Sequence, residues 1–363
     1  MIGKAKSPKA AVLIVVVYIV AALSMLAFAL TFRSRIAIRQ AQLLIENLQQ
    51  EEIARAACVQ ACGVLAADDE SVDCLDEPWS VWHELVPAEV TDQSIGTEDS
   101  PWQVCWKLVD ESAKINLNLA SADLLSGLEC LDEAAVASIL DWIDKDDVPN
   151  PDGAEDDYYS SLEPPYSCKD GPIDNIEELL LIKGITPQIY YGANLDEAGN
   201  HSAEIDTEST EFAEADPQNS PVGLRDLLTV YGDGRININT VSERVLHAIP
   251  LLSDAAIAEI ISRQRSASRK FGSMDDIQNN GSFTITDKLL LMQIAKFNSN
   301  HFQLYVKVRK RGNPFWCEYV ATIERQGENT QLLSWQRKSR PVIKDITHFT
   351  SSSEEGSYSK GLM

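Results

Sequence analysis

The acidic stretch at residues 144–157 holds the side chains best suited to chemistry. Seven carboxylates crowd around a single base, Lys145: Asp144, Asp146, Asp147, Asp152, Glu155, Asp156 and Asp157. Carboxylates a few ångströms apart raise one another's pKa or need a counter-cation. Because Ca²⁺ takes oxygen ligands in flexible geometry, the stretch predicts a calcium site, although its spacing is not that of an EF-hand. A solvated acidic loop is the alternative.

Catalytic interpretations of the same residues find little support. Two carboxylates can carry out acid–base hydrolysis, but the loop is rich in proline and no aromatic sugar platform is evident beside it. The five histidines are scattered, and no glycine-rich phosphate loop or nucleophile elbow occurs. We therefore predict a non-catalytic protein. A membrane-anchored hydrolase that uses the loop carboxylates is the weakest of three hypotheses, and the other two are given below.

The helices that must position this loop form part of an internal repeat. Residues 114–142 align without gaps on residues 235–263. Each copy begins with an Ile-Asn element and continues through a serine, Ser121 or Ser242, into a short helix. Serine is a favourable N-cap because its oxygen accepts a hydrogen bond from the first helical turn. The repeat predicts two small helical modules side by side.

The turn Leu-Ile-Lys-Gly-Ile-Thr at residues 181–186 is similar to the glycine turn of helix-hairpin-helix DNA-binding units. A membrane-anchored DNA-binding receptor is therefore the second hypothesis. The alternative for Gly184 is a helix end that needs a left-handed residue. The neighbouring residues are acidic, and only Lys183 offers a phosphate partner.

Strand patterns flank the helical region on both sides. Residues 102–120 alternate and are rich in β-branched side chains, as expected of a short strand pair. Residues 301–310, 315–326 and 330–339 predict three more strands joined by polar turns. The simplest architecture is an antiparallel sheet interrupted by an inserted helical domain.

An uncharged apolar run at residues 10–32 predicts a transmembrane helix. About 23 residues of helix reach some 34 Å, enough to cross a bilayer. A cleaved secretory signal is the alternative, but no small-x-small site follows the run. Apolar residues continue at helical spacing to about residue 65, so we expect one long helix whose second half packs on a soluble domain.

The net charge of −24, from 55 acidic and 31 basic residues, argues against nucleic-acid binding. The excess of acids lies in the middle of the chain, since residues 1–40 contain no acidic side chain. The seven cysteines form no paired CxxC zinc motif. In an oxidising compartment up to three disulfides could form, and their pairing stays open.

Several motifs together resemble the K-type minor pseudopilins of bacterial type II secretion systems. They are DWID at 141–144, GAEDDYY at 153–159, PPY at 164–166, EELLLIKGIT at 177–186, ININT at 236–240 and FNSNHFQLYVKV at 297–308. Their order and approximate spacing match the family to about residue 340. The resemblance implies an α+β pseudopilin fold: a long N-terminal helix packed on an antiparallel sheet that carries a large inserted helical domain.

The resemblance also implies a role. Such proteins cap the pseudopilus with I- and J-type minor pseudopilins, so we expect these partners, inner-membrane lipid and a single-pass protein with a periplasmic soluble domain. The family's helical domain binds Ca²⁺. The matching positions are Asp144, Asp146, Asp147, Asp152, Glu155 and Asp156.

At the N-terminus the sequence departs from the family pattern. Prepilin peptidases cut after a glycine that precedes the apolar run, and the matching position here is Lys9, followed by Ala10. If Ala10 were the mature first residue, the fifth would be Ile14. Most pseudopilins have Glu there to neutralise a neighbour's amino group, whereas an apolar residue is typical of a subunit at the filament tip.

The expected organisation follows from these patterns. A basic leader-like segment occupies residues 1–9, the N-terminal helix 10–65, the acidic connection and first strands 66–118, the inserted helical domain 119–297 with an acidic linker at 194–220, the closing strands 298–344 and a disordered tail 345–363.

Overall fold

The computed structural model describes residues 8–85, 101–192, 222–266, 268–313 and 315–338. The predicted linker at 194–220 and tail at 345–363 lie outside the described residues. By its contacts the chain divides into two compact units, Met1–Ala56 and Ala57–Met363.

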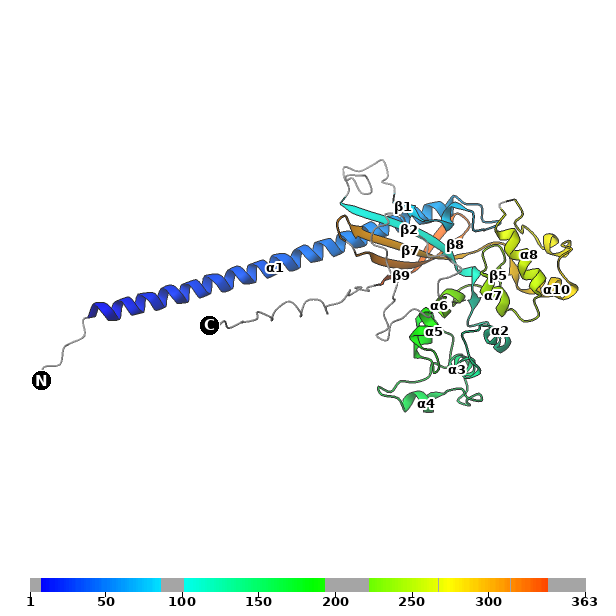
Figure 1. Ribbon diagram of the computed structural model, residues 1–363, viewed down its shortest axis with the longest axis horizontal. Helices are drawn as coiled ribbons and strands as arrows, with labels where there is room; N and C mark the ends of the chain where they lie inside the picture. Colours follow the sequence, from blue (N-terminus) through cyan, green and yellow to red (C-terminus); the bar gives the residue numbers. More distant parts are fainter. Residues whose placement is uncertain (1–7, 86–100, 193–221, 267, 314, 339–363) are drawn as a thin grey trace, which may run out of the picture. The chain divides into compact units, whose positions relative to one another are not determined.

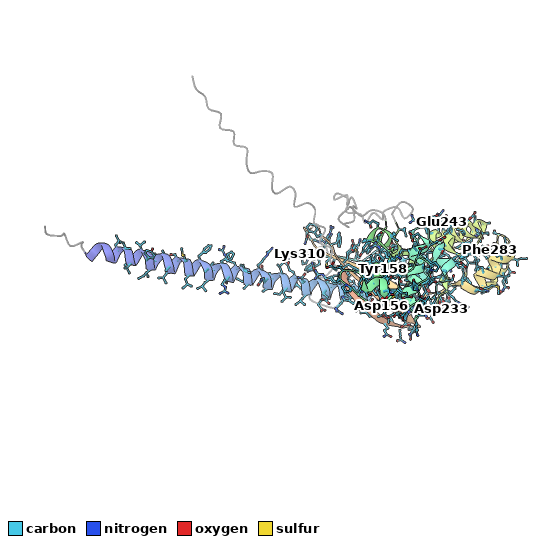
Figure 2. All side chains as sticks on the ribbon, turned by 90° about the horizontal axis from the view of Figure 1, so that it is seen from below. Asp156, Tyr158, Asp233, Glu243, Phe283 and Lys310 are labelled. Atoms are coloured by element: carbon cyan, nitrogen blue, oxygen red, sulfur yellow. The ribbon has the colours of Figure 1, made fainter. Side chains whose placement is uncertain are left out.

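One continuous helix, α1 (Pro8–Ala66), makes up the described part of the first unit and runs into the second (Figure 1). No proline or glycine interrupts it between residues 9 and 62. Its most apolar window has a mean hydropathy of 2.8, and none of that window is buried. The apolar side chains along this segment project from the helix and are exposed (Figure 2). By length and composition α1 can cross a membrane, as predicted.

The second unit contains a five-stranded antiparallel sheet in the order β1-β2-β7-β8-β9. Its strands are β1 (His83–Glu84), β2 (Trp102–Asp110), β7 (His301–Lys310), β8 (Cys317–Gln326) and β9 (Asn329–Lys338). Buried and half-buried residues alternate along β7, as the period of two requires for a sheet with one core face.

The last turns of α1 lie on the core face of this sheet. Trp106 of β2 faces Val306 of β7 in the register, and its Nε1 donates a 2.8 Å hydrogen bond to Oε1 of Gln60 on α1. Ala57, Ala61 and Leu65 are fully buried on the same helix. The predicted packing of the long helix on an antiparallel sheet is confirmed.

The sheet is interrupted between β2 and β7, which pair from Trp102↔Lys310 to Asp110↔Phe302. The chain between them forms short helices and two small parallel ladders, β3–β4 and β5–β6 (Figure 1). The elements are η2 (Glu111–Ala113), β3 (Ile115–Asn116), α2 (Ala122–Ser126), α3 (Glu133–Ile143), α4 (Asp156–Ser160), η3 (Ile176–Leu181), α5 (Pro187–Tyr191), α6 (Leu224–Leu227), β4 (Leu228–Thr229), β5 (Ile236–Asn237), α7 (Glu243–Ala248), α8 (Asp254–Gln264), α9 (Met274–Gln278), α10 (Ile285–Ile294) and β6 (Ala295–Lys296).

The strand pair predicted at residues 102–120 is wrong in detail. The segment holds the long strand β2, the turn η2 and the short strand β3, which belongs to a different sheet. The side chain of Asp110 ends β2 because it accepts a 2.7 Å hydrogen bond from the Ser112 amide and caps η2.

The two predicted modules, here called the first module (residues 114–142) and the second module (residues 235–263), make similar contacts. Asn118 bonds both backbone groups of Ile173 through its side-chain amide, at 2.7 and 2.9 Å. Asn239 does the same to Phe271, at 2.8 and 2.9 Å.

The two modules also touch each other at Gly127, beside α2 in the first, and Ala248 of α7 in the second. A Cβ at Gly127 would lie 2.2 Å from the Ala248 carbonyl oxygen, so only glycine allows this approach. The helix N-caps correspond as well, since Ser121 and Ser242 each accept a hydrogen bond from the amide three residues on.

None of the seven cysteines, all of which lie in the described residues, forms a disulfide in the structure. Cys58 and Cys62 lie one turn apart on α1, and a hydrogen bond from Cys58 lowers the pKa of Cys62 to about 6. Cys74, Cys105 and Cys168 are buried elsewhere in the second unit.

Candidate metal site

Helix α3 places two carboxylates at the start of the acidic loop. Asp132 caps its N-terminus by accepting a 2.8 Å hydrogen bond from the Ala135 amide. Asp141 and Asp144 are three residues apart at the other end, so they lie on one side of the helix. Negative charge at a helix C-terminus is unfavourable, and no basic residue occupies the last turn. This end of α3 therefore favours a cation.

Asp141 folds the loop back onto the helix. Its fully buried carboxylate accepts hydrogen bonds from the Asn150 amide at 3.1 Å, the Asn150 side chain at 2.5 Å and the Ala154 amide at 2.7 Å. Gly153 lies so close that a Cβ there would stand 1.9 Å from Asp141 Oδ2. The loop can close over Asp141 only because residue 153 is glycine.

Lys183 fixes the same loop from the side of the glycine turn. Its Nζ donates to the carbonyl oxygens of Asp152 and Gly153, both at 3.0 Å, and lies 5.1 Å from the centre of the Tyr158 ring. Gly184 has a φ of +87°, and a Cβ there would lie 3.2 Å from the Ala135 Cβ. The one base of the helix-hairpin-helix-like turn is therefore engaged within the protein.

Glu155 is the most unusual carboxylate of the loop. It precedes α4 and is only 4% exposed, yet neither carboxylate oxygen accepts a hydrogen bond from the residues that the structure describes. Burial, reinforced by the nearby charge of Asp141, raises its pKa to about 7. A buried acceptor pair without donors is costly unless a cation satisfies it.

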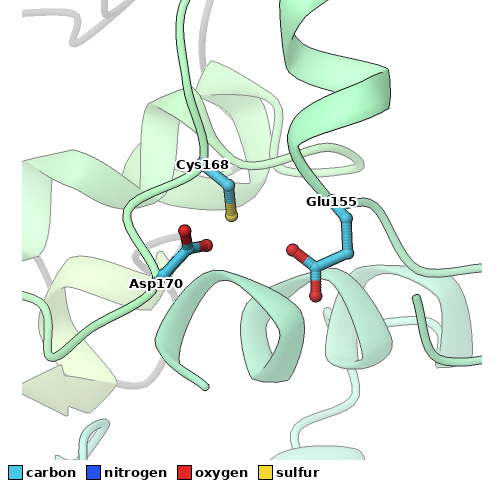
Figure 3. A group of neighbouring side chains, drawn as sticks. All are labelled: Glu155, Cys168 and Asp170. Atoms are coloured by element: carbon cyan, nitrogen blue, oxygen red, sulfur yellow. The ribbon is translucent and has the colours of Figure 1, made fainter. Parts of the chain in front are cut away.

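Glu155 belongs to two groups of candidate ligands. In the first, Asp141, Asp144 and Glu155 offer oxygens that all lie within 4.8 Å of one another. In the second, Glu155 joins Cys168 and Asp170 within the same limit, and Figure 3 shows these three side chains pointing toward one another. Within the described ranges, no Lys or Arg forms an ion pair with any of these five residues.

The predicted ligands separate into two sets. The structure brings Asp144 and Glu155 together, and Asp156 lies beside them, where Oδ1 accepts a 3.0 Å hydrogen bond from the Cys168 amide. The remaining predicted residues, Asp146, Asp147 and Asp152, are exposed and belong to neither group.

The sequence-based ligand set omitted Asp141, Cys168 and Asp170. Asp141 could have been found, because it precedes Asp144 by one helical turn and so shares its side of the helix. Cys168 and Asp170 follow a proline-rich turn, and nothing in their spacing indicates that this turn returns them to Glu155.

The residues fit a hard divalent cation. Three carboxylates supply oxygen ligands, and Ca²⁺ completes a shell of six to eight oxygens with water and carbonyl groups. A third group, elsewhere in the second unit, consists of Asp68, Asp73 and Glu77. Its carboxylate oxygens also lie within 4.8 Å of one another, but a basic side chain of the protein already neutralises it. Arg325 is 1% exposed there and donates to both oxygens of Asp73, at 2.7 and 2.5 Å.

The predicted processing position lies within the first helix. Lys9 and Ala10 belong to the first turn of α1, which begins at Pro8. Cleavage there stays a prediction.

Comparison with known proteins identifies relatives over part of the chain. Residues 108–193 match the family model of type II secretion system protein K. The type II secretion system protein K of Pectobacterium carotovorum subsp. carotovorum is 40% identical over 58 residues, 16% of this chain and 18% of the relative. The protein of the same name from Klebsiella pneumoniae is 27% identical over 197 residues, 49% of this chain and 58% of the relative. The matches thus span less than two thirds of either relative.

A solved structure shares the fold. It is the GspK-GspI-GspJ complex from the type 2 secretion system of enterotoxigenic Escherichia coli, which superimposes with a TM-score of 0.53 at 17% identity, covering 85% of this chain and all of the matched chain.

Proposed function

We propose, because the chain belongs to the type II secretion system protein K family, that it is a minor pseudopilin of a type II secretion system. In this role it is a non-catalytic subunit at the tip of the pseudopilus, where it initiates or caps the filament. Its location is the bacterial inner membrane, crossed once by α1, with the second unit in the periplasm. The observation that carries the proposal is the pairing of β2 with β7 around an inserted helical region.

The partners that we propose are I-type and J-type minor pseudopilins of the same cell. The matched complex contains GspI and GspJ beside GspK, and α1 offers an apolar surface of the kind that buries against other helices. Leu44 and Leu48 are one turn apart and more than half exposed on that surface.

Co-purification from detergent tests this assembly. The full chain should recover the I- and J-type partners, and a Leu44→Asp, Leu48→Asp double variant should lose them, because it places charge in a helix–helix contact. Gln42→Asp, on the same exposed part of α1, is the matched control and should retain them. Failure of the unaltered chain to recover either partner would contradict the proposal.

We also propose that the acidic loop, which follows the first module, binds Ca²⁺. Of the predicted ligands, Glu155 and Asp144 have the strongest support, Asp141 joins them, and Asp156 orients the neighbouring chain. Asp146, Asp147 and Asp152 could reach the ion only if the exposed part of the loop closed over it. Added Ca²⁺ should raise the melting temperature of the chelator-treated chain, and a melting temperature unchanged by both treatments would contradict the site.

We infer further that the two modules are copies of one ancestral unit. The support is the constant offset of 121 positions that relates Asn118 to Asn239 and Ser121 to Ser242. The same offset relates Gly127 to Ala248, which touch each other. A contact between equivalent positions is expected of two copies packed about an approximate twofold axis.

A further inference from the structure

The group formed by Glu155, Cys168 and Asp170 shares only Glu155 with the proposed calcium site, and one of its other two ligands is a thiol. Glu155 comes from the start of α4, and the other two lie in the turn after Pro164 and Pro165 (Figure 3). The three ligand atoms lie within 4.8 Å of one another. Ligands around a tetrahedral Zn²⁺ are on the order of 3.5 Å apart, so small side-chain movements would bring these atoms into coordination range.

Two side chains in this group have oxygens without hydrogen-bond donors. Both oxygens of the 4% exposed Glu155 and Oδ1 of Asp170 are buried and accept no hydrogen bond from the part of the chain that the structure describes. An acidic cluster alone would be an ordinary feature. Here the buried Glu155 carboxylate is directed at a thiol and a second carboxylate. Lys169, between Cys168 and Asp170 in the chain, pairs with Asp174 and Glu178 instead, and among the described residues no base forms an ion pair with the three ligands.

The backbone holds the thiol in this position. The Cys168 amide donates to Asp156 Oδ1 at 3.0 Å, and the Gly171 amide donates to the Trp142 carbonyl at 3.4 Å. Asp170 between them has a φ of +50°, a left-handed conformation that aspartate tolerates better than most residues. The turn thereby presents residues 168 and 170 on the same side, toward Glu155.

We propose that Glu155, Cys168 and Asp170 form a binding site for a thiophilic divalent cation, Zn²⁺, with water as the fourth ligand. The site adjoins the proposed calcium site and shares Glu155 with it, but its selectivity comes from sulfur. Ca²⁺ coordinates oxygen almost exclusively, whereas Zn²⁺ binds thiolate and carboxylate together.

Binding exchanges a proton for the metal. A cysteine thiol ordinarily carries its proton at neutral pH, so the sulfur must lose it to bind a metal. The incoming cation forms the metal–sulfur bond as the S–H bond breaks, and the proton passes to solvent. Ca²⁺ binds sulfur too weakly to displace this proton, which adds to the discrimination.

Cobalt is a direct probe, because Co²⁺ bound to thiolate gives a near-ultraviolet charge-transfer band and Co²⁺ bound only to oxygen does not. The full chain in detergent, kept reduced and freed of metal by a chelator, is titrated with Co²⁺. We expect a thiolate band that saturates at about one ion per chain, that Zn²⁺ abolishes and that excess Ca²⁺ leaves in place.

Variants assign the band to its ligand. Cys168→Ser should abolish it, and Asp170→Asn should weaken Co²⁺ binding about tenfold. Cys62→Ser is the control, since the Cys58–Cys62 pair on α1 is the competing thiol group, and it should retain the band. Circular dichroism establishes that each variant is folded, and Asp170→Asn provides a second test if Cys168→Ser does not fold.

Absence of a band, or a band that survives Cys168→Ser, would overturn the zinc site. This failure is distinct from failure of the calcium proposal, because the Cys168→Ser variant keeps Asp141, Asp144 and Glu155. Its calcium-dependent rise in melting temperature should therefore persist. A cobalt band without any calcium effect would contradict the calcium site and support the thiol site.

Discussion

Two groups of carboxylates in the second unit meet the same geometric criterion and differ in what neutralises them. Asp73 sits against Arg325, and both side chains are withdrawn from solvent. Glu155 sits against Asp141 and Asp144, and no basic side chain of the described residues pairs with any of the three. Three acidic residues within 4.8 Å therefore do not define a metal site by themselves. The presence or absence of an internal cation distinguishes the two groups.

Glu155 also differs from Glu259, a carboxylate on α8 of the second module, in the residues that surround it. Glu259 of the second module accepts hydrogen bonds from Arg263 at 2.8 Å, Asn280 at 3.2 Å and Arg269 at 3.4 Å. The Arg263 hydrogen bond holds the pKa of Glu259 below its usual value, whereas the pKa of Glu155 is raised to about 7. The half-buried Glu259 is neutralised by neighbouring arginines, and we infer that Glu155 relies on an ion.

Removal of Arg325 should have the largest effect on stability. Arg325→Met leaves Asp73 buried without its partner, and we expect a loss of about 3–5 kcal/mol in the free energy of unfolding. Ca²⁺ should not restore it if the Asp73 group depends on the guanidinium alone. Denaturant unfolding measures the loss, and Arg244→Met, at an exposed position, should change stability by less than about 0.5 kcal/mol. If Ca²⁺ restored the lost stability, the Asp73 group could also bind an external cation, and the proposed difference between the two groups would be wrong.

Calcium should stabilise the unaltered chain by about 2.7 kcal/mol at a hundredfold excess over its dissociation constant. Glu155→Gln should remove most of this effect, since it takes away a charged ligand that both candidate groups share. Glu129→Gln, at an exposed position outside the groups, is the matched control. If Ca²⁺ raised the melting temperatures of both variants equally, Glu155 would not be a ligand of the ion.

The paired asparagines test whether the modules are equivalent away from the acidic loop. Asn118→Ala and Asn239→Ala each remove a side chain that bonds both backbone groups of one residue, and should each cost about 1–3 kcal/mol. Similar losses in denaturant unfolding would support a common architecture. A much smaller loss for Asn118→Ala would show that the stability of the first module depends more on the acidic loop that follows it than on this asparagine.

The pH dependence of stability should differ between the metal-free and calcium-bound chain. The folded pKa of Glu155, about 7, lies above its usual value, so its protonated form favours the fold at low pH. That contribution is lost as the pH rises from about 4.5, the usual pKa of the group, to about 7, because the unfolded chain releases its proton over this range while folded Glu155 still holds it. Calcium affinity should rise over the same range. Glu155→Gln should flatten both profiles, and unchanged profiles would contradict the assignment.

The long helix and the interrupted sheet could be predicted because they rest on local patterns: an uncharged run and strict alternation at residues 301–310. The acidic loop was also evident. Which carboxylates are buried was not, because that depends on how the loop folds over Asp141. The close approach at Gly153 and the return of Cys168 are tertiary features with no periodic signal.

Titration calorimetry of the full chain, freed of metal by a chelator, tests most directly whether the acidic loop after the first module binds an external cation. We predict saturable Ca²⁺ binding that Glu155→Gln weakens at least about tenfold and Arg244→Met leaves unchanged. Absence of binding at millimolar Ca²⁺, or binding indifferent to Glu155→Gln, would contradict it.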